Sequence, residues 1–346
     1  MSDPTVGLVM PTSFDPESTM AGGERYAFEL SRALADRVPT TLLTFARQPK
    51  TVRVGNLTIR YCPVVADAGG GINPVSVSHL APLRRCDVIH CLQPHTIVTD
   101  LALLWGWLCR RRTFLTDLAG GAPIRPSRLI PMTNLMTGFL PISEYNRSLN
   151  PQITRPAAVI STGVDAQTFA PDTSVARHAR RVMYLGRLFE GKGLHVLIDA
   201  LPEDVALDVV GSGDAAYLTR VRAMAAGKTV VFHGSLPDAE IVRLYRQSAL
   251  LVLPSLVDSG VTSSLEAMAC ETPVVGSRLG TLTELVTAET GWLVTPNDVA
   301  ALRAALTDAL SDQGRLRARG AAARRDVLAR FTWASVAERC LTAYRG

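Results

Sequence analysis

The sequence has few lysines, no paired cysteines and no long hydrophobic run. Only three of its 36 basic residues are lysine (Lys50, Lys192 and Lys228), and a residue type used so rarely is a candidate for a specific task. The six cysteines show no Cys-x-x-Cys pair, no disulfide-like spacing and no neighbouring histidine cluster, which excludes structural zinc and predicts a reduced, cytosolic chain. The most apolar stretch, 96–109, is shorter than the roughly 20 residues of a spanning helix, and no signal-peptide pattern is present.

Other absences narrow the function further. The chain has no internal repeat, no nucleic-acid-binding motif and no Asp-x-Asp pair of the kind that holds a catalytic metal ion. Its net charge is only +5, which suits an anionic partner without demonstrating one. We interpret Lys50 and Lys228 as ordinary loop charges and look for the anion-binding group at Lys192.

Short apolar runs alternate with helical patterns along the whole chain of 346 residues, which is typical of parallel sheets built from βαβ units. The strands expected in the first half are 6–10, 41–45, 57–61, 87–90, 113–116, 140–143 and 157–160. Those expected in the second half are 182–185, 206–210, 229–232, 250–253, 274–276 and 292–294. The pattern predicts an α/β protein with two doubly wound domains, whose ligands bind at the carboxyl ends of the strands.

The expected domains are 1–167 and 168–328, followed by a C-terminal helix at 329–346. The helical pattern from 314 to 344 begins with a run of five arginines. A run of this kind is usually a solvated helix face, and an anionic surface contact is the alternative. These arginines are Arg315, Arg317, Arg319, Arg324 and Arg325.

The first motif that carries chemistry is the segment 184–194, where a strand ends and Arg187 and Lys192 flank a glycine-containing loop before a helix. Two cations and the free N–H groups of a helix start are a common phosphate site in α/β proteins. The segment is not a Walker loop, because Gly-x4-Gly-Lys-Ser/Thr is absent. Surface positions are the alternative for both side chains.

The second motif is the segment 254–269, which follows a later strand. Asp258 lies in the loop and Glu266 on the next helix, and between them the amides of 260–263 open that helix. Carboxylates are poor phosphate ligands but good acceptors for sugar hydroxyls, so the two motifs together indicate a sugar nucleotide. The alternatives are an N-cap for Asp258 and an exposed helix position for Glu266.

With these residues in place, the chain resembles the retaining glycosyltransferases of family 4 over essentially its whole length. The family's Gly-Arg-x5-Lys stretch matches Gly186, Arg187 and Lys192, and its two acids match Asp258 and Glu266. Further similar segments, in the family's order, are 22–25, 87–90, 160–165, 231–235 and 265–275. The resemblance implies the GT-B architecture, in which two Rossmann-like domains face each other across a cleft and the C-terminal helix returns to the first domain.

The resemblance also implies roles, with the acceptor on the first domain and a nucleoside diphosphate sugar on the second. Arg187 and Lys192 neutralise the diphosphate, Asp258 contacts the transferred sugar, and Glu266 binds the ribose. Further residues are expected to contact the donor, either through their backbone or beside the nucleotide base. They are Gly22, Gly23, His233, Gly234, Ser235, Gly260, Val261 and Thr262. Family members retain the anomeric configuration and need no metal, so no cofactor is expected beyond the sugar nucleotide as co-substrate.

Three positions depart from the family pattern. The first acid is Asp258 where Glu is common, and Thr281 stands for the second glycine of a Gly-Gly-x-x-Glu motif that ends at Glu284. A sugar-contacting histidine of the first domain is replaced by Leu118. Asp117 beside Leu118 is a catalytic candidate, either taking a sugar hydroxyl or stabilising developing positive charge, and a turn cap is its alternative.

The acceptor is the least constrained part. His90 and His95 are acceptor-side candidates, with a structural role as the alternative for each. The segment 105–112 joins two tryptophans to three arginines, which fits either a buried helix with solvated arginines or peripheral contact with an anionic inner membrane face beside a lipid-linked acceptor.

Two other functions stay open at this point. They are a non-catalytic sugar-nucleotide-binding subunit and a GT-B epimerase or phosphorylase. The missing histidine at Leu118 motivates the first, whereas the arrangement of Asp258 and Glu266, together with the chain length, disfavours the second.

Overall fold

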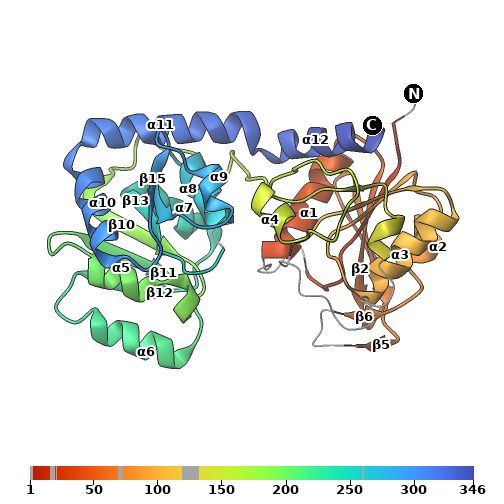
Figure 1. Ribbon diagram of the computed structural model, residues 1–346, viewed down its shortest axis with the longest axis horizontal. Coiled ribbons are helices and arrows are strands. Elements are labelled where there is room, and N and C mark those ends of the chain that lie inside the picture. Colours follow the sequence, from red (N-terminus) through yellow and green to blue (C-terminus); the bar gives the residue numbers. More distant parts are fainter. Residues whose placement is uncertain (1–2, 16–19, 21, 69–72, 119–131, 259–260) are drawn as a thin grey trace. The chain divides into compact units, whose positions relative to one another are not determined.

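The chain folds into two compact units. A computed structural model describes all of it except residues 1–2, 16–19, 21, 69–72, 119–131 and 259–260. Unit 1 comprises Met1–Gly163 together with Trp333–Gly346, and unit 2 comprises Val164–Thr332 (Figure 1). The C-terminal helix therefore belongs to unit 1, as the resemblance implied. It leaves unit 2 after 332, whereas the sequence placed this boundary after 328.

Unit 1 is built on a seven-stranded sheet with the order β3-β4-β2-β1-β7-β8-β9. The strands are β1 (Val6–Val9), β2 (Thr40–Ala46), β3 (Lys50–Val54), β4 (Leu57–Pro63), β7 (Val88–Cys91), β8 (Arg112–Leu115) and β9 (Gly138–Phe139). Every neighbouring pair is parallel except β3 and β4. A separate two-stranded sheet pairs β5 (Ala66–Asp67) with β6 (Pro74–Val75).

Helices cover both faces of this sheet. One face packs against α1 (Gly22–Ala35) and α12 (Trp333–Arg345), and the other packs mainly against α3 (Ile97–Leu108). Tyr26 of α1 and Trp333 of α12 stack edge to face with 5.5 Å between their ring centroids. The shorter helices are α2 (Leu80–Leu83), the 3₁₀ turn η2 (Met132–Leu135) and α4 (Glu144–Ser148). Among the described residues, no helix has the length and apolarity needed to cross a bilayer.

Two of the strands expected in this unit were wrong, and the edge strand β3 was missed. The search for short apolar runs missed β3, because Lys50–Val54 contains no such run and lies largely exposed at the sheet edge. The strand expected at 140–143 lies instead at 138–139, since Pro141 has no N–H to continue the ladder. The strand expected at 157–160 is a single bridge between Ala157 and Phe139.

Unit 2 is a fully parallel sheet with the order β12-β11-β10-β13-β14-β15. The strands are β10 (His178–Leu185), β11 (Ala206–Val210), β12 (Val230–Gly234), β13 (Ser248–Leu253), β14 (Val274–Ser277) and β15 (Gly291–Val294). The chain adds strands on one side of β10 and then continues on the other side with β13. This reversal is the switch point at which doubly wound sheets bind ligands beyond the strand ends.

The helices of unit 2 lie in two layers (Figure 1). One layer contains α5 (Leu194–Ala200), α6 (Ala215–Met224) and α10 (Val299–Ser311). The other contains α7 (Asp238–Gln247), α8 (Val261–Ala269), α9 (Leu282–Leu285) and α11 (Gln313–Arg330). The buried apolar residues therefore form a core on each side of the sheet, and its carboxyl edge is left to the loops.

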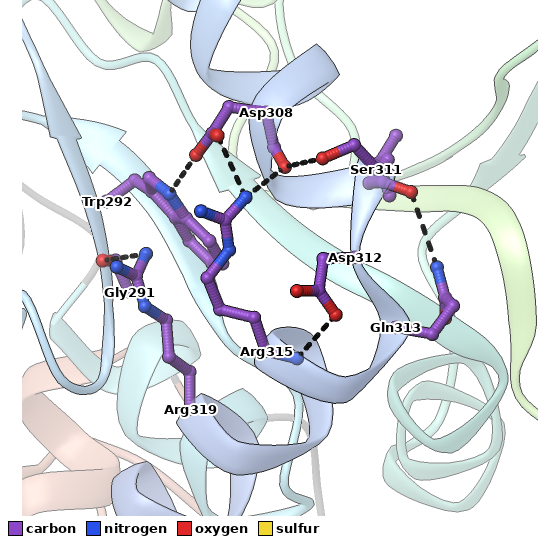
Figure 2. A network of polar contacts seen from close by, with 9 residues as sticks. Gly291, Trp292, Asp308, Ser311, Asp312, Gln313, Arg315 and Arg319 are labelled. Carbon is purple, nitrogen blue, oxygen red and sulfur yellow. Dashed lines mark hydrogen bonds and ion pairs between the residues drawn. The ribbon is translucent and has the colours of Figure 1, made fainter.

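The arginine-rich helix α11 is only partly a solvated face. Arg315 pairs with Asp308 at 2.8 Å, and the guanidinium of Arg319 lies 3.8 Å from the ring centroid of Trp292, as Figure 2 shows for both side chains. The Arg319 guanidinium also donates to the backbone oxygen of residue 291 at the sheet edge. The two exposed arginines of the run are Arg317 and Arg325.

Candidate functional site

Three neighbouring strands of unit 2 end in glycines that bring their backbones close together. The N–H of Gly186 after β10 donates to the oxygen of Val210 at 3.1 Å, and the N–H of Gly211 after β11 donates to Gly234 at 2.8 Å. Gly211 has a φ of 133°, and a Cβ there would lie 2.0 Å from the oxygen of Gly186. A side chain at residue 211 would therefore clash with the neighbouring strand end. With glycine there, a ligand bound at the carboxyl edge of the sheet can approach the backbone closely.

The sequence interpretation did not single out Gly211. Its signal was present, because Gly211-Ser-Gly213 directly follows a buried strand, which is where α/β proteins place ligand loops. A Cβ on Gly213 would lie 2.2 Å from the oxygen of Leu188. The loop after β11 is thus packed against the loop that carries Arg187 and Lys192.

The loop after β10 is also fixed to the loop after β13, across the switch point. Lys192 ends a 3₁₀ turn, η3 (Glu190–Lys192), and Gly193 follows in the left-handed region with a φ of 67°. A Cβ on Gly193 would lie 1.9 Å from the oxygen of Pro254, and the N–H of Leu256 donates to Gly191 at 2.8 Å. The structure therefore brings the two predicted motifs together.

Lys192 is the electrostatic centre of this arrangement. The pKa of its ammonium group is lowered to about 8, mainly by burial and also by repulsion from Arg187, while attraction to Asp258 opposes both effects. The side chain is half-buried, whereas Arg187 is exposed with its guanidinium 5.2 Å from the centroid of the Phe189 ring. Two cations and one carboxylate leave an excess of positive charge, which an anion would compensate.

Asp258 is exposed and contacts a neighbouring loop. Its Oδ1 accepts from the backbone N–H of Thr281 at 2.8 Å, and its Oδ2 accepts from the Thr281 hydroxyl at 3.2 Å. The carboxylate therefore holds Thr281, the residue that precedes α9, which is a different role from the N-cap of the following helix that the sequence offered as the alternative.

Glu266 lies in the interior on α8, with 5% of its surface exposed. The Tyr245 hydroxyl lies 3.1 Å from its Oε2 and 3.2 Å from the backbone oxygen of Ser263. Burial and the nearby carboxylate raise the pKa of Tyr245 well above its usual value, so Tyr245 stays a donor. The alternative of an exposed helix glutamate is wrong.

Two arginines from distant segments hold the carboxyl end of α8. Arg177 donates to the backbone oxygens of Cys270 at 3.0 Å and Glu271 at 2.5 Å, and Arg324 donates to Ala269. Cations at this end complement the helix dipole and fix the helix that carries Glu266. Sequence reasoning missed both residues, because nothing in the pattern links positions 177 and 324 to α8.

Beside the expected base-side loop lies a buried carboxylate that the sequence interpretation also missed. Asp208 on β11 has none of its surface exposed, and its Oδ1 lies 2.7 Å from Nε2 of His233. Arg181 on β10 has its Nε 2.7 Å from the other oxygen, Oδ2. Asp208 fixes the His233 ring immediately before Gly234 and Ser235. A lone acid inside an apolar strand was the available signal.

The remaining donor-side predictions fall around the start of α8. Val261 and Thr262 form its first turn, whose N–H groups find no acceptor inside the helix. Gly260 lies outside the described residues. Glu284 lies on α9 and is half-buried.

In unit 1, His90 is a core residue. Its Nε2 lies 2.8 Å from the Thr116 hydroxyl, which donates its only proton to the oxygen of Leu140, so Nε2 carries the proton of the ring. Nδ1 then accepts from the Tyr344 hydroxyl of α12 at 2.6 Å. Complete burial lowers the pKa of His90 to about 3. Both nitrogens are engaged, which leaves neither for an acceptor, and His90 instead joins α12 to the sheet.

Asp117 is also fully buried, and its Oδ2 accepts from the amide of Asn150 at 2.9 Å. His95 is half-buried, with a φ of 61°, and precedes Thr96, the N-cap of α3. Gly22 opens α1, and a Cβ on Gly23 would lie 3.9 Å from the Leu118 side chain. The structure thus brings the opening loop next to the position where the family's histidine is absent. Sugar contact by Asp117 and acceptor contact by His95 stay predictions.

Residues 167–326, nearly all of unit 2, match the family described as "Glycosyl transferases group 1". The second unit of this chain is therefore similar to the group 1 glycosyl transferases. The match confirms the resemblance drawn from the motifs around Lys192 and Glu266. Among the described residues, no group of three His, Cys, Asp or Glu side chains could hold a metal ion.

Curated relatives match part of the chain. It is 32% identical over 222 residues to GDP-mannose-dependent alpha-(1-6)-phosphatidylinositol monomannoside mannosyltransferase from Mycolicibacterium smegmatis, covering 56% of this chain and 58% of that protein. It is 31% identical over 213 residues to D-inositol 3-phosphate glycosyltransferase from Corynebacterium diphtheriae, covering 54% and 50%. The chain spans about half the length of the curated relatives it matches.

Solved structures match over the whole chain. Sucrose-phosphate synthase from Thermosynechococcus elongatus superimposes with a TM-score of 0.77 at 21% identity, covering 99% of this chain and 98% of that one. The Anabaena protein HepE in complex with UDP superimposes with a TM-score of 0.79 at 19% identity, covering 99% of each. These likenesses confirm the GT-B fold class.

Proposed function

We propose that this protein transfers a sugar from a nucleoside diphosphate sugar to an acceptor, with retention of configuration and without a metal ion. The observation that carries the proposal is the paired positive charge of Arg187 and Lys192 at the switch point of a group 1 unit. Cleavage of the donor leaves negative charge on the diphosphate while positive charge grows on the anomeric carbon. Fixed cations at the diphosphate stabilise that charge, which is usually the largest single catalytic contribution.

The other groups divide the donor between them. Glu266, buried and held by Tyr245, accepts hydrogen bonds from the ribose hydroxyls, and Asp258 accepts from the sugar. The loop of His233, Gly234 and Ser235, oriented by Asp208, borders the base. The first turn of α8 adds N–H donors to the diphosphate. The donor phosphate itself takes the acceptor's proton, so no residue of the chain is needed as a general base.

A panel of sugar nucleotides tests the proposal. The panel includes GDP-mannose and UDP-glucose, because one relative is named for the first and a structural neighbour, HepE, has been crystallised with the second. One member is expected to raise the melting temperature and to release its nucleoside diphosphate when an acceptor extract is added. Binding without release in any extract would favour the non-catalytic subunit, and conversion of the donor to its epimer would favour an epimerase.

Donor binding is expected to weaken at alkaline pH. The pKa of Lys192 is about 8 in the free protein. Its side chain therefore carries a positive charge below that pH and loses the proton, and with it the charge, above that pH. The Kd for the donor should be constant from pH 6 to 7.5 and then rise by about tenfold per pH unit above 8. Titration calorimetry measures this dependence. In Lys192→Arg the cation persists, so a Kd that still rises above pH 8 in that variant would exclude Lys192 as the cause.

We also propose that unit 1 of the protein contacts an anionic membrane surface, beside which a lipid-linked acceptor would lie. At the end of α3 the Trp107 and Leu108 side chains are 56% and 59% exposed, and Arg110 beside them is exposed. The two arginines that follow are used internally, because Arg111 pairs with Asp87 and Arg112 donates to the backbone of Tyr344. An apolar pair with a cation suits the interface of a lipid bilayer.

Vesicle sedimentation tests this contact. The protein is expected to bind vesicles containing phosphatidylglycerol and not vesicles of phosphatidylcholine alone, and Trp107→Ser with Leu108→Ser should abolish the binding. Val65→Ser, which changes another apolar side chain of unit 1 that is 84% exposed, is the matched control. Equal sedimentation of the double variant and the wild type would contradict the assignment.

A further inference from the structure

We propose that Thr281 is a positioning residue that fixes the Asp258 carboxylate, and that this pair sets which donor sugar the site accepts. The inference rests on the proposed function, because it gives a purpose to Asp258 only where a sugar nucleotide binds. It goes beyond that function by naming the structural origin of donor choice.

The contact between the two residues uses both oxygens of the carboxylate. The Thr281 N–H donates to Oδ1 at 2.8 Å, and the Thr281 hydroxyl lies 3.2 Å from Oδ2. Two bonds from one residue define both the position and the plane of the carboxylate. An exposed Asp side chain without them would be free to rotate about its Cα–Cβ and Cβ–Cγ bonds.

The backbone before Thr281 is shaped around this carboxylate. Gly280 has a φ of 55°, and a Cβ at that position would lie 2.0 Å from Oδ1 of Asp258. The Thr283 hydroxyl closes the same turn by donating to the oxygen of Gly280 at 2.8 Å. Residue 280 must therefore be glycine as long as Asp258 occupies this place.

Two departures from the family pattern meet in this contact. A glutamate at 258 would place its carboxylate roughly 1.5 Å further along the side chain, beyond the range in which both hydrogen bonds from Thr281 could form. A glycine at 281 would keep the N–H but remove the hydroxyl. The shorter acid and the added hydroxyl therefore fit each other in this contact.

A fixed carboxylate can discriminate between sugars. An ionised carboxylate has about four lone-pair directions, of which Thr281 uses two. The other two can accept hydroxyls of a sugar only where those hydroxyls point at them. An epimer with a hydroxyl turned away leaves an acceptor unpaired, which reduces kcat/KM by roughly tenfold to 100-fold.

The test compares discrimination between two donors in Thr281→Val, which keeps the shape and the N–H but removes the hydroxyl. The two donors are the one selected by the panel and an epimer of its sugar on the same nucleotide. The ratio of their kcat/KM values is expected to fall by at least tenfold, with the loss for the preferred donor mainly in kcat. Thr281→Ser, which restores a hydroxyl, should restore the ratio, and Thr219→Val, which changes an exposed threonine of α6 in the same unit, is the matched control.

A second pair of variants keeps the inference testable should Thr281→Val fold poorly. Asp258→Glu should reduce the ratio, and combining it with Thr281→Gly should not reduce it further, because the contact is already lost. An unchanged ratio in Thr281→Val, or fully additive losses in the double variant, would overturn the inference.

Affinity for the nucleoside diphosphate alone separates this inference from the proposed function. That affinity should be unchanged in Thr281→Val and weakened in Lys192→Ala. If Thr281→Val kept the wild-type donor ratio while Lys192→Ala lost diphosphate binding, only the inference would fail. If Lys192→Ala bound the diphosphate normally, the proposed function itself would fail.

Discussion

Replacing Lys192 with alanine is expected to reduce sugar transfer by roughly 100-fold or more, the scale of removing one preorganised charge contact. The structure gives the reason. Lys192 is half-buried beside a second cation, Arg187, in a loop that Gly193 and the Leu256 N–H fix against the next strand end. Its ammonium is therefore already in place when charge develops on the diphosphate.

The fold should survive this substitution. Burial and repulsion from Arg187 disfavour the Lys192 charge in the free protein, as its lowered pKa of about 8 shows, so removing the charge does not destabilise unit 2. The melting temperature without ligand should match the wild type, whereas the rise on adding donor should be lost. Lys228→Ala, which removes another lysine of the same unit, should keep full activity. Near-wild-type transfer in Lys192→Ala would exclude the phosphate assignment.

The centre of the candidate site could be predicted because its motifs follow strand ends. The Arg187–Lys192 loop follows β10 and the Asp258 loop follows β13, and a parallel sheet brings the carboxyl ends of its strands to one edge. Periodicity also gave the inner strands β13 and β14 of unit 2, since each is buried along its whole length and reads as an apolar run. The exposed edge strand β3 has no such run and was missed.

The supports of the site could not be predicted, because they join segments with no shared pattern. Thr281 lies 23 residues from Asp258, and Arg177 lies 93 residues from the end of α8 that it holds. Such contacts depend on how loops fold over the sheet. Asp208 is different, since a single acid within the apolar run 206–210 gave a signal that the pattern analysis did not use.

In unit 1, contacts between segments far apart in the sequence decide the role of a predicted site residue. His90 lies near the end of strand β7, where site residues are common, and its contacts with Thr116 and Tyr344 show that it belongs to the core. Its partner Tyr344 lies 254 residues away on α12. His90, which the sequence suggested as an acceptor-side candidate, therefore helps to hold the C-terminal helix against the sheet of unit 1.

Replacing Glu266 with glutamine is expected to reduce kcat/KM by roughly 100-fold. A carboxylate accepts hydrogen bonds from both ribose hydroxyls, and each bond to a charged group contributes about 1.5–3 kcal/mol. Glutamine keeps one acceptor oxygen but turns an NH₂ donor toward a hydroxyl that had been donating. The shape is unchanged, and Tyr245 can still donate to the amide oxygen or to Ser263, so the melting temperature should stay near that of the wild type.

Donors that lack a ribose hydroxyl show whether Glu266 acts on the ribose. With the natural donor, Glu266→Gln should show the full reduction in kcat/KM. With a 2′-deoxy or 3′-deoxy analogue, kcat/KM of the wild type should already be lower, and the substitution should reduce it by a smaller factor. Glu203→Gln, which alters an exposed glutamate of the same unit, is the matched control. An equal loss with natural and deoxy donors would contradict ribose recognition. Glu266 would then act by stabilising α8, and the melting temperature of the variant would fall with its activity.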